Sequence, residues 1–155
     1  MKIYLLRHGE AEFGNPKGDF YRTLSEEGRS QVARLGGVLR QRQLYFDCVI
    51  CSSAIRTLET KDLVLNFVNA GMILETSELY EAELESLVSY LNRIPKECKR
   101  TLLIGHNPGI SALVDFLSGS GFTHMDTGMM AILDSTFEDW SLLGRDSCSL
   151  LEFIR

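Results

Sequence analysis

The features that the sequence lacks exclude several classes of protein. None of its hydrophobic runs is long enough to cross a membrane, although 45% of the 155 residues are hydrophobic. Its formal net charge of -5 provides no basic excess for binding nucleic acid. It contains no internal repeat, low-complexity tract or linker. We therefore expect one domain over residues 1–155, whose partners include neither nucleic acid nor a membrane.

The cysteines lack the spacing of a zinc site or a disulfide framework. Cys48 and Cys51 lie three residues apart in a predicted strand, so their side chains should face opposite sides of the sheet. Cys98 and Cys148 form no second close pair. We expect four buried thiols. The N-terminus also lacks the basic, apolar and small-residue regions of a signal peptide, and together these absences predict a reducing, cytoplasmic location.

Apolar runs alternate with segments of helical periodicity along most of the chain. This alternation predicts a three-layer α/β/α sandwich around a mostly parallel sheet. Two later apolar runs, 129–133 and 148–154, predict a C-terminal hairpin at one edge of that sheet. The loops at 12–21 and 118–127 are expected to border a pocket. The expected strands are 2–6, 46–51, 72–76 and 101–105, and the expected helices are 25–43, 54–68, 83–94 and 108–118.

The first strand ends in an arrangement suited to phosphate. Arg7, His8, Gly9 and Glu10 directly follow the apolar residues 3–6. The arginine offers a planar fork of donors, the imidazole can attack phosphorus or hold a proton, and glycine allows a ligand to approach the backbone. Taken alone, such a histidine more often satisfies a buried hydrogen bond.

A second arginine follows the next buried strand. Ser52 or Ser53 can cap the helix that begins there, which leaves Arg56 in its first turn. Free backbone donors and the positive end of the helix dipole attract anions at this position. The alternative is a surface ion pair between Arg56 and Glu59, which would contribute little.

The third junction follows residues 101–105. Asn107 is predicted to be the N-cap of the next helix and Pro108 its first residue, where a missing N–H costs nothing. His106 is therefore held at a strand tip beside a helix N-terminus. A capped turn explains the asparagine and the proline, but it does not require the histidine.

The carboxyl ends of parallel strands meet at one edge of a sheet. Arg7, His8, Arg56 and His106 should therefore converge on one crevice in spite of their separation in sequence. We expect two imidazoles in a cradle of guanidinium groups that is large enough for one tetrahedral anion.

These motifs resemble those of the histidine phosphatase superfamily, which is also called phosphoglycerate mutase-like. Its Arg-His-Gly-Glu, Ser-Ser-x-x-Arg-Thr-x-Glu-Thr and Gly-His-Asn-Pro motifs occur here in the family's order, at residues 7–10, 52–60 and 105–108. The short chain, Arg22 and the segment 78–82 are most similar to SixA-type phosphohistidine phosphatases. The resemblance covers nearly the whole chain and implies the phosphoglycerate mutase-like fold.

The chemistry of these groups, read with this resemblance, predicts a phosphatase that needs no cofactor. His8 is predicted to attack phosphorus in line and to carry the phosphoryl group until water releases it. It must be neutral, with its other ring nitrogen donating to a carbonyl or carboxylate. Arg7 and Arg56 would hold the phosphoryl oxygens, Arg22 would add a third cation, and His106 would donate to an oxygen in the transition state.

Protonation of the leaving group is assigned to Glu81. The superfamily often places a glutamate at this point, although SixA-type members vary there. The alternative is a carboxylate that, like Glu83, is favoured by the dipole of the following helix. Glu10 is expected to orient its loop or to shape the pocket.

A metal-dependent hydrolase is the rival enzymatic interpretation. His124 would then join His8, His106 and Glu81 as ligands. The nearby arginines raise the electrostatic cost of a divalent ion, and the histidines have no recognised ligand spacing. We therefore expect no metal.

We expect the substrate to be phosphohistidine in a signalling or phosphotransfer protein. A compact chain with few insertions should leave a shallow crevice, which suits a protein side chain better than a small metabolite. A small-molecule phosphomonoesterase and a phosphate-binding module without turnover are the alternatives, and mutase activity would need a more closed site. The sequence does not indicate an oligomeric state.

Overall fold

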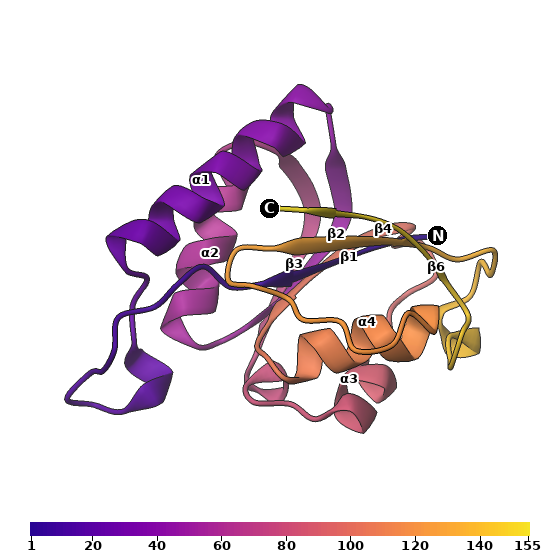
Figure 1. The fold of residues 1–155 in the computed structure, drawn as a ribbon. Coiled ribbons are helices and arrows are strands. Elements are labelled where there is room, and N and C mark those ends of the chain that lie inside the picture. The colour runs from indigo at the N-terminus through magenta and orange to yellow at the C-terminus, as the bar shows by residue number, and fades with distance from the viewer.

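The computed structural model describes residues 1–155 as a six-stranded sheet with four α-helices (Figure 1). Three short 3-10 helices, η1 (Asp19–Tyr21), η2 (Ser77–Leu79) and η3 (Trp140–Leu142), lie in the connections. The strands are β1 (Lys2–Arg7), β2 (Tyr45–Ser52), β3 (Asn69–Thr76), β4 (Arg100–Gly105), β5 (Met130–Asp134) and β6 (Ser149–Ile154). The helices are α1 (Glu26–Gln41), α2 (Ile55–Leu65), α3 (Leu84–Leu91) and α4 (Gly109–Ser118).

The strand order across the sheet is β3-β2-β4-β1-β5-β6. The first four strands in this order are parallel, whereas β5 runs antiparallel to β1 and pairs with β6 as a hairpin at the edge. The predicted mostly parallel sheet with a C-terminal edge hairpin is therefore confirmed. Because the parallel strands run in one direction, β1, β2 and β4 end at the same edge of the sheet.

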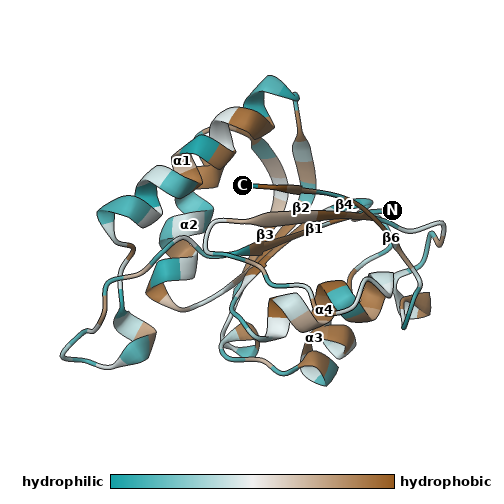
Figure 2. Ribbon diagram, in the orientation of Figure 1, coloured by the Kyte–Doolittle hydropathy of each residue, from teal (hydrophilic) through white to brown (hydrophobic).

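The helices form the two outer layers of the sandwich. In Figure 1, α1 and α2 lie together on one face of the sheet and α3 and α4 on the other, and Figure 2 shows that the strands between them are largely hydrophobic. Each face has its own core. One core packs Leu87, Leu113 and Trp140 against β1 and β4, and the other packs Val32, Leu35 and Val64 against the opposite face of the same strands.

The N-terminus of α1 follows from local sequence. The Ser25 hydroxyl accepts from the Gly28 N–H, and Glu26 and Glu27 occupy the first turn, where the helix dipole favours negative charge. Val32, Leu35 and Leu39 then recur at helical spacing and are fully buried.

The predicted caps of α2 and α4 are wrong. Ala54 is the N-cap of α2 and Pro108 that of α4, and neither helix has a side-chain cap. The Asn107 side chain instead donates to the Met125 carbonyl and accepts from the Ser111 hydroxyl. The Asn107 side chain, which the local sequence predicted to be the cap, is therefore used in hydrogen bonds to other residues.

The cysteine prediction is partly wrong. All four cysteines are buried, and Cys48 and Cys51 lie in the two different cores, as strand geometry requires. However, Cys48 and Cys98 form a disulfide, with their Cα atoms 5.6 Å apart, so only Cys51 and Cys148 are free thiols. The two partners are 50 residues apart in sequence and become neighbours only because β2 packs beside β4.

None of the four helices combines the length and the apolar character that a membrane-spanning helix needs.

A glycine in α1 permits close contact with the loop that follows β1. A Cβ atom on Gly28 would lie 1.9 Å from the Glu10 carbonyl oxygen, whereas one on Gly37 would meet nothing within 4 Å. We expect Gly28→Ala to lower the free energy of unfolding by about 2 kcal/mol or more through steric overlap. Gly37→Ala, the matched control in the same helix, should raise it by roughly 0.5 kcal/mol. Urea denaturation tests both; equal effects would contradict the proposed contact.

Candidate active site

The three predicted junctions meet at one edge of the sheet. Arg7 is the last residue of β1, Arg56 is the second residue of α2 directly beyond β2, and His106 follows β4. They border a cavity of about 280 Å³. Its eleven lining residues are Arg7, His8, Glu10, Ala11, Asp19, Arg22, Arg56, Glu81, His106, Asn107 and Thr127.

The His8 ring is buried and its orientation is fixed by the backbone. Its Nδ1 lies 2.7 Å from the Gly9 carbonyl oxygen, which can only accept, so Nδ1 carries the proton. The lone pair therefore resides on Nε2, to which Arg56 Nε donates over 3.2 Å. Burial, reinforced by the charges of Arg56 and Arg7, lowers the pKa of His8 to about 4. The ring is therefore neutral near pH 7.

The His106 ring lies beside it, with the two ring centres 5.2 Å apart. Its Nδ1 is 3.3 Å from Arg56 Nη2, and its Nε2 is 2.8 Å from the Ser52 hydroxyl. Because the guanidinium can only donate, Nδ1 accepts and Nε2 carries the proton. Burial and the neighbouring His8 and Arg56 lower the pKa of His106 to about 3.

Arg56 connects these groups. Its side chain is only 6% exposed, and it donates to both histidines and to Asp19, whose carbonyl and carboxylate oxygens lie 2.8 and 3.1 Å away. The predicted alternative, a surface pair with Glu59, is therefore wrong, because Glu59 instead accepts from Arg29 and from the Leu24 N–H.

A threonine ties the loop of His8 to the helix of Arg56. The Thr60 hydroxyl accepts from the Gly9 N–H over 3.1 Å and donates to the Arg56 carbonyl over 2.7 Å. Thr60 is fully buried. His8 and Arg56 are thus held together in two ways: by the bridge from Thr60 to their backbones and by the hydrogen bond between their side chains.

Arg7 contributes a further guanidinium group to the cavity. Its Nη1 donates to the Met125 carbonyl, while its buried Nε has no hydrogen-bond partner. Burial lowers the pKa of Arg7. An unpaired buried donor is costly, so an anion beside it would be stabilised.

Sequence reasoning missed Asp19, which lies at the centre of the loop contacts. Its carboxylate accepts from Arg22 over 2.9 Å, from Arg56 over 3.1 Å and from the Tyr80 hydroxyl over 2.6 Å. The hydrogen bond from Tyr80, followed by that from Arg22, lowers the pKa of Asp19. Its spacing of three residues from Arg22 was the only signal in the sequence.

The remaining predicted residues also reach this region. Arg22 lines the cavity, and its Nε donates to the Glu12 carbonyl. Glu81 lines the cavity too. Because α3 begins at Leu84, Glu81 lies before the first turn of that helix, and the predicted alternative, a carboxylate in the N-terminal turn of the helix, is wrong. Glu10 accepts from the Ser25 hydroxyl, which holds its loop against α1.

The metal site considered from the sequence is not assembled. The His124 side chain is 75% exposed, pairs with Asp126 over 3.4 Å and does not line the cavity. No three side chains of the kinds that ligate metals gather anywhere in the chain.

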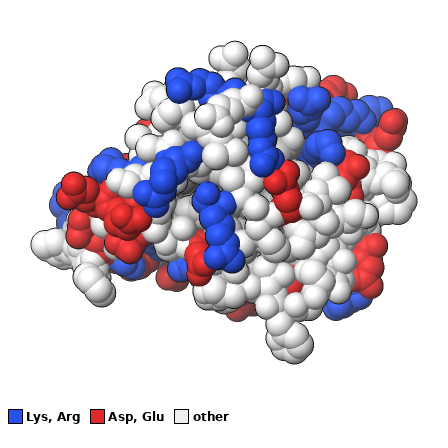
Figure 3. Space-filling model, turned by 45° about the horizontal axis from the view of Figure 1, so that its top comes forward, with Lys and Arg blue, Asp and Glu red and all other residues white.

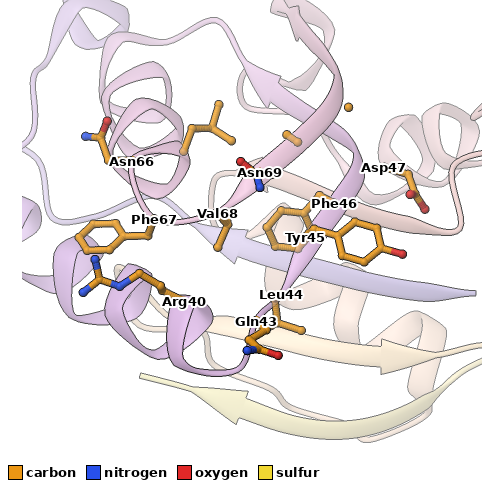
Figure 4. Close-up of a pocket in the computed structure, with 13 residues that line it drawn as sticks. Arg40, Gln43, Leu44, Tyr45, Phe46, Asp47, Asn66, Phe67, Val68 and Asn69 are labelled. Atoms are coloured by element: carbon orange, nitrogen blue, oxygen red, sulfur yellow. The ribbon is translucent and has the colours of Figure 1, made fainter.

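A larger hollow of about 830 Å³ lies at the opposite end of the sheet (Figure 4). It surrounds the first residues of β2 and β3, Tyr45 and Asn69, and Figure 4 shows the Arg40 side chain beside the Phe67 ring. No histidine lines it. Volume alone is therefore a poor guide to the chemistry of this molecule.

Charges of both signs are mixed on the face drawn in Figure 3. Figure 3 shows Lys and Arg side chains along the upper part of one face and a group of acidic side chains at its left side. The cavity is also lined by charges of both signs: three carboxylates, those of Glu10, Asp19 and Glu81, and three arginines.

The fold and the site define an α/β protein in which strand tips, the start of α2 and one loop present two neutral imidazoles and three guanidinium groups to one cavity. Residues 3–89, more than half of the chain, match the histidine phosphatase superfamily (branch 1). The matched segment contains Arg7, His8 and Arg56. The chain therefore belongs to the histidine phosphatase superfamily.

Its relatives of known sequence include proteins of similar and of greater length. The uncharacterized protein ML1117 of Mycobacterium leprae is 28% identical over 96% of this chain and 98% of its own length. The 2,3-bisphosphoglycerate-dependent phosphoglycerate mutase of Rhizobium etli is 30% identical over 61% of this chain and 48% of its own length.

Solved structures of SixA proteins have the same fold. A SixA protein from Nakamurella multipartitia has a TM-score of 0.85 at 24% identity, covering 99% of this chain and 95% of that one. The protein histidine phosphatase SixA complexed with tungstate has a TM-score of 0.86 at 21% identity, covering 99% and 96%. Superfamily membership, together with phosphatases among the structural neighbours, supports phosphatase activity for this chain.

The buried histidines predict a specific dependence on pH. Their pKa values lie below the ordinary value near 6.5, so the unfolded chain takes up protons below that pH while the folded chain does not. Stability from these groups is therefore fully present above about pH 6.5 and declines toward pH 4. Between pH 8 and pH 5 we expect the free energy of unfolding to fall by about 4 kcal/mol, and His8→Asn should remove about half of this dependence.

Histidine ring resonances followed by NMR between pH 4 and 8 provide the direct measurement. The rings of His8 and His106 should remain neutral at pH 5.5. Titration of either ring near pH 6.5 would contradict the assignment of a neutral, buried pair.

Proposed function

We propose that this protein is a cofactor-independent phosphatase that works through a phosphohistidine on His8 and removes phosphate from histidine side chains of other proteins. The observation that carries the proposal is the fixed tautomer of His8. Its proton is held on Nδ1 by the Gly9 carbonyl, so the Nε2 lone pair lies among the guanidinium groups that would bind phosphoryl oxygens.

In the first step, His8 Nε2 attacks phosphorus in line. A bond forms between this nitrogen and phosphorus while the bond from phosphorus to the leaving group breaks, and the electron pair departs with the leaving group. Arg7 has an unpaired buried Nε–H, and Arg56 can transfer donors from the two histidines to the phosphoryl oxygens.

His106 would donate to a phosphoryl oxygen through Nδ1. This role requires a change of tautomer, because Nδ1 accepts from Arg56 when no phosphate is bound. The Ser52 hydroxyl beside Nε2 can both donate and accept, so it can rotate to support either tautomer. Water then attacks phosphorus, the bond to His8 breaks, and phosphate is released.

The lining of the cavity supports a protein side chain as substrate. Only one of its eleven lining residues is hydrophobic, and its volume of about 280 Å³ is small. Sites that enclose small metabolites are larger and mainly apolar. SixA, which shares the fold, was solved with tungstate, a tetrahedral oxyanion, and is named a protein histidine phosphatase.

A small-molecule phosphomonoesterase is the second candidate, and the position of Glu81 favours it. This carboxylate lines the cavity, where it would be available to protonate an alcohol leaving group. An imidazole leaves without such an acid when its other nitrogen is already protonated. The two candidates therefore differ in whether Glu81 is required.

Removal of the nucleophile tests the phosphohistidine intermediate. We expect His8→Ala to lose at least about 1,000-fold in turnover, because no other group in the cavity replaces the attacking nitrogen. His124→Ala is the matched control, since that ring lies outside the cavity, and its turnover should match that of the unmodified protein.

The intermediate itself can be trapped. Brief exposure to substrate, followed by mass spectrometry under conditions that preserve phosphoramidates, should locate acid-labile phosphate on His8. Unchanged turnover in His8→Ala would refute the nucleophile assignment. Phosphate binding without turnover in the unmodified protein would identify a binding module instead.

Glu81→Gln separates the two substrate classes. If Glu81 is an acid, hydrolysis of alkyl phosphates should fall by about 100-fold or more, while hydrolysis of a histidine-phosphorylated protein should fall far less. Glu83→Gln, outside the cavity, is the control. Efficient turnover of an alkyl phosphate alone in the unmodified protein would favour the phosphomonoesterase.

A further inference from the structure

We propose that Asp19, with the rings of Phe20 and Tyr80, forms a subsite at the rim of the cavity that binds the imidazole of the substrate and keeps a proton on its distal nitrogen. The inference rests on the proposed phosphohistidine substrate. It assigns the residues that would select a phosphate bound to nitrogen over one bound to oxygen.

Exposure places Asp19 on the side of the cavity where a leaving group would lie. The Asp19 side chain is 41% exposed, whereas that of Arg56 is 6% exposed and His8 is buried. The nucleophile therefore lies at the floor and the carboxylate at the rim. A substrate that reaches His8 with its phosphoryl group extends toward the rim, where Asp19 lies, because in-line attack directs the leaving group away from the nucleophile.

The Asp19 carboxylate retains capacity for one more donor. An ionised carboxylate offers about four acceptor positions. Arg56 and Tyr80 use two positions on Oδ2, while Arg22 uses one on Oδ1. The remaining position on Oδ1 can accept a ring N–H from the substrate.

Two aromatic residues adjoin this carboxylate at the margin of the cavity, outside its eleven lining residues: Phe20 follows Asp19 in the chain, and the Tyr80 hydroxyl donates to Asp19 Oδ2. The Phe20 and Tyr80 rings pack edge to face with centres 5.0 Å apart, and the Tyr80 and His106 rings lie nearly perpendicular with centres 5.5 Å apart. Phe20 is half-buried and immediately follows Asp19 in η1. Aromatic rings beside a carboxylate attract a flat cation, which a protonated phosphoimidazole ring is.

A proton on the distal nitrogen decides whether an imidazole can leave. When the bond to phosphorus breaks, the electron pair goes to the ring nitrogen that held phosphorus. If the distal nitrogen is protonated, the product is neutral imidazole, whereas an unprotonated ring would leave as an anion. A carboxylate that accepts from the distal N–H favours the protonated form and therefore promotes cleavage. The same carboxylate repels the negative charge that develops on a departing alcohol oxygen.

The groups that face Asp19 keep it in the acceptor form. Its hydrogen bonds from Tyr80 and Arg22 lower its pKa, and the hydrogen bond to Asp19 raises the pKa of Tyr80 to about 12. Arg56 also faces the carboxylate, and Glu81 and the neutral His106 lie nearby. Because its pKa is lowered, Asp19 is ionised near pH 7 and serves as an acceptor and not as an acid.

The test compares Asp19→Asn with the unmodified protein on phosphoimidazole and on p-nitrophenyl phosphate. Because Asp19 also holds Arg56, both activities should fall. We expect kcat/KM for phosphoimidazole to fall at least about tenfold further, which is the worth of one charge-assisted hydrogen bond. The alkaline limb of the kcat profile for phosphoimidazole should move to lower pH by about one unit, because the substrate ring loses its proton more easily.

Asp126→Asn is the matched control. It removes another exposed carboxylate whose charge acts on Arg7 but which does not line the cavity, so the ratio of the two activities should not change. Equal losses on both substrates in Asp19→Asn, with an unmoved pH profile, would reduce Asp19 to a residue that positions Arg56 and would overturn the subsite. Failure of the unmodified protein to hydrolyse phosphoimidazole and phosphohistidine proteins would overturn the proposed function and the subsite together.

Discussion

The site depends on one buried guanidinium group. Arg56 donates to the nucleophile candidate His8, to His106 and to Asp19, and its positive charge helps to keep both imidazoles neutral. Burying an isolated charge is costly, so such a group is retained only when its donors are used. Here those donors connect the start of α2 with two strand tips and one loop. Arg56 therefore contributes to the orientation of both rings, to their neutral state and to the placement of the loop, together with burial and the Gly9 carbonyl.

Much of the fold was predictable because it depends on local pattern. Buried parallel strands are continuous apolar runs, and amphipathic helices bury residues at helical spacing. The edge strand β3 begins at Asn69, earlier than predicted, because its first residues are paired by β2 and not marked by apolar side chains. The caps at Ser52 and Asn107 failed for a related reason, since both side chains form tertiary hydrogen bonds. Local sequence preferences cannot predict hydrogen bonds to residues that are distant in the sequence.

The site was predictable to the extent that it lies at strand tips. Arg7, His8, Arg56 and His106 follow apolar runs, so the parallel topology alone brings them together. Asp19 has no such marker, because it lies in a short 3-10 helix within an irregular loop. The pairing of Cys48 with Cys98 was missed for a similar reason, since it is created by the neighbouring strands and not by spacing.

The Thr60 hydroxyl has a consequence for how this architecture can diverge. It joins the backbone beyond His8 to the backbone of Arg56, so the separation of these two groups is set inside the molecule by a single bridging oxygen. Insertions or deletions in an exposed connection such as 12–18 leave that bridge in place. Related chains can therefore differ in the loops around the site, and so in the substrate they accept, while His8 and Arg56 keep the same separation.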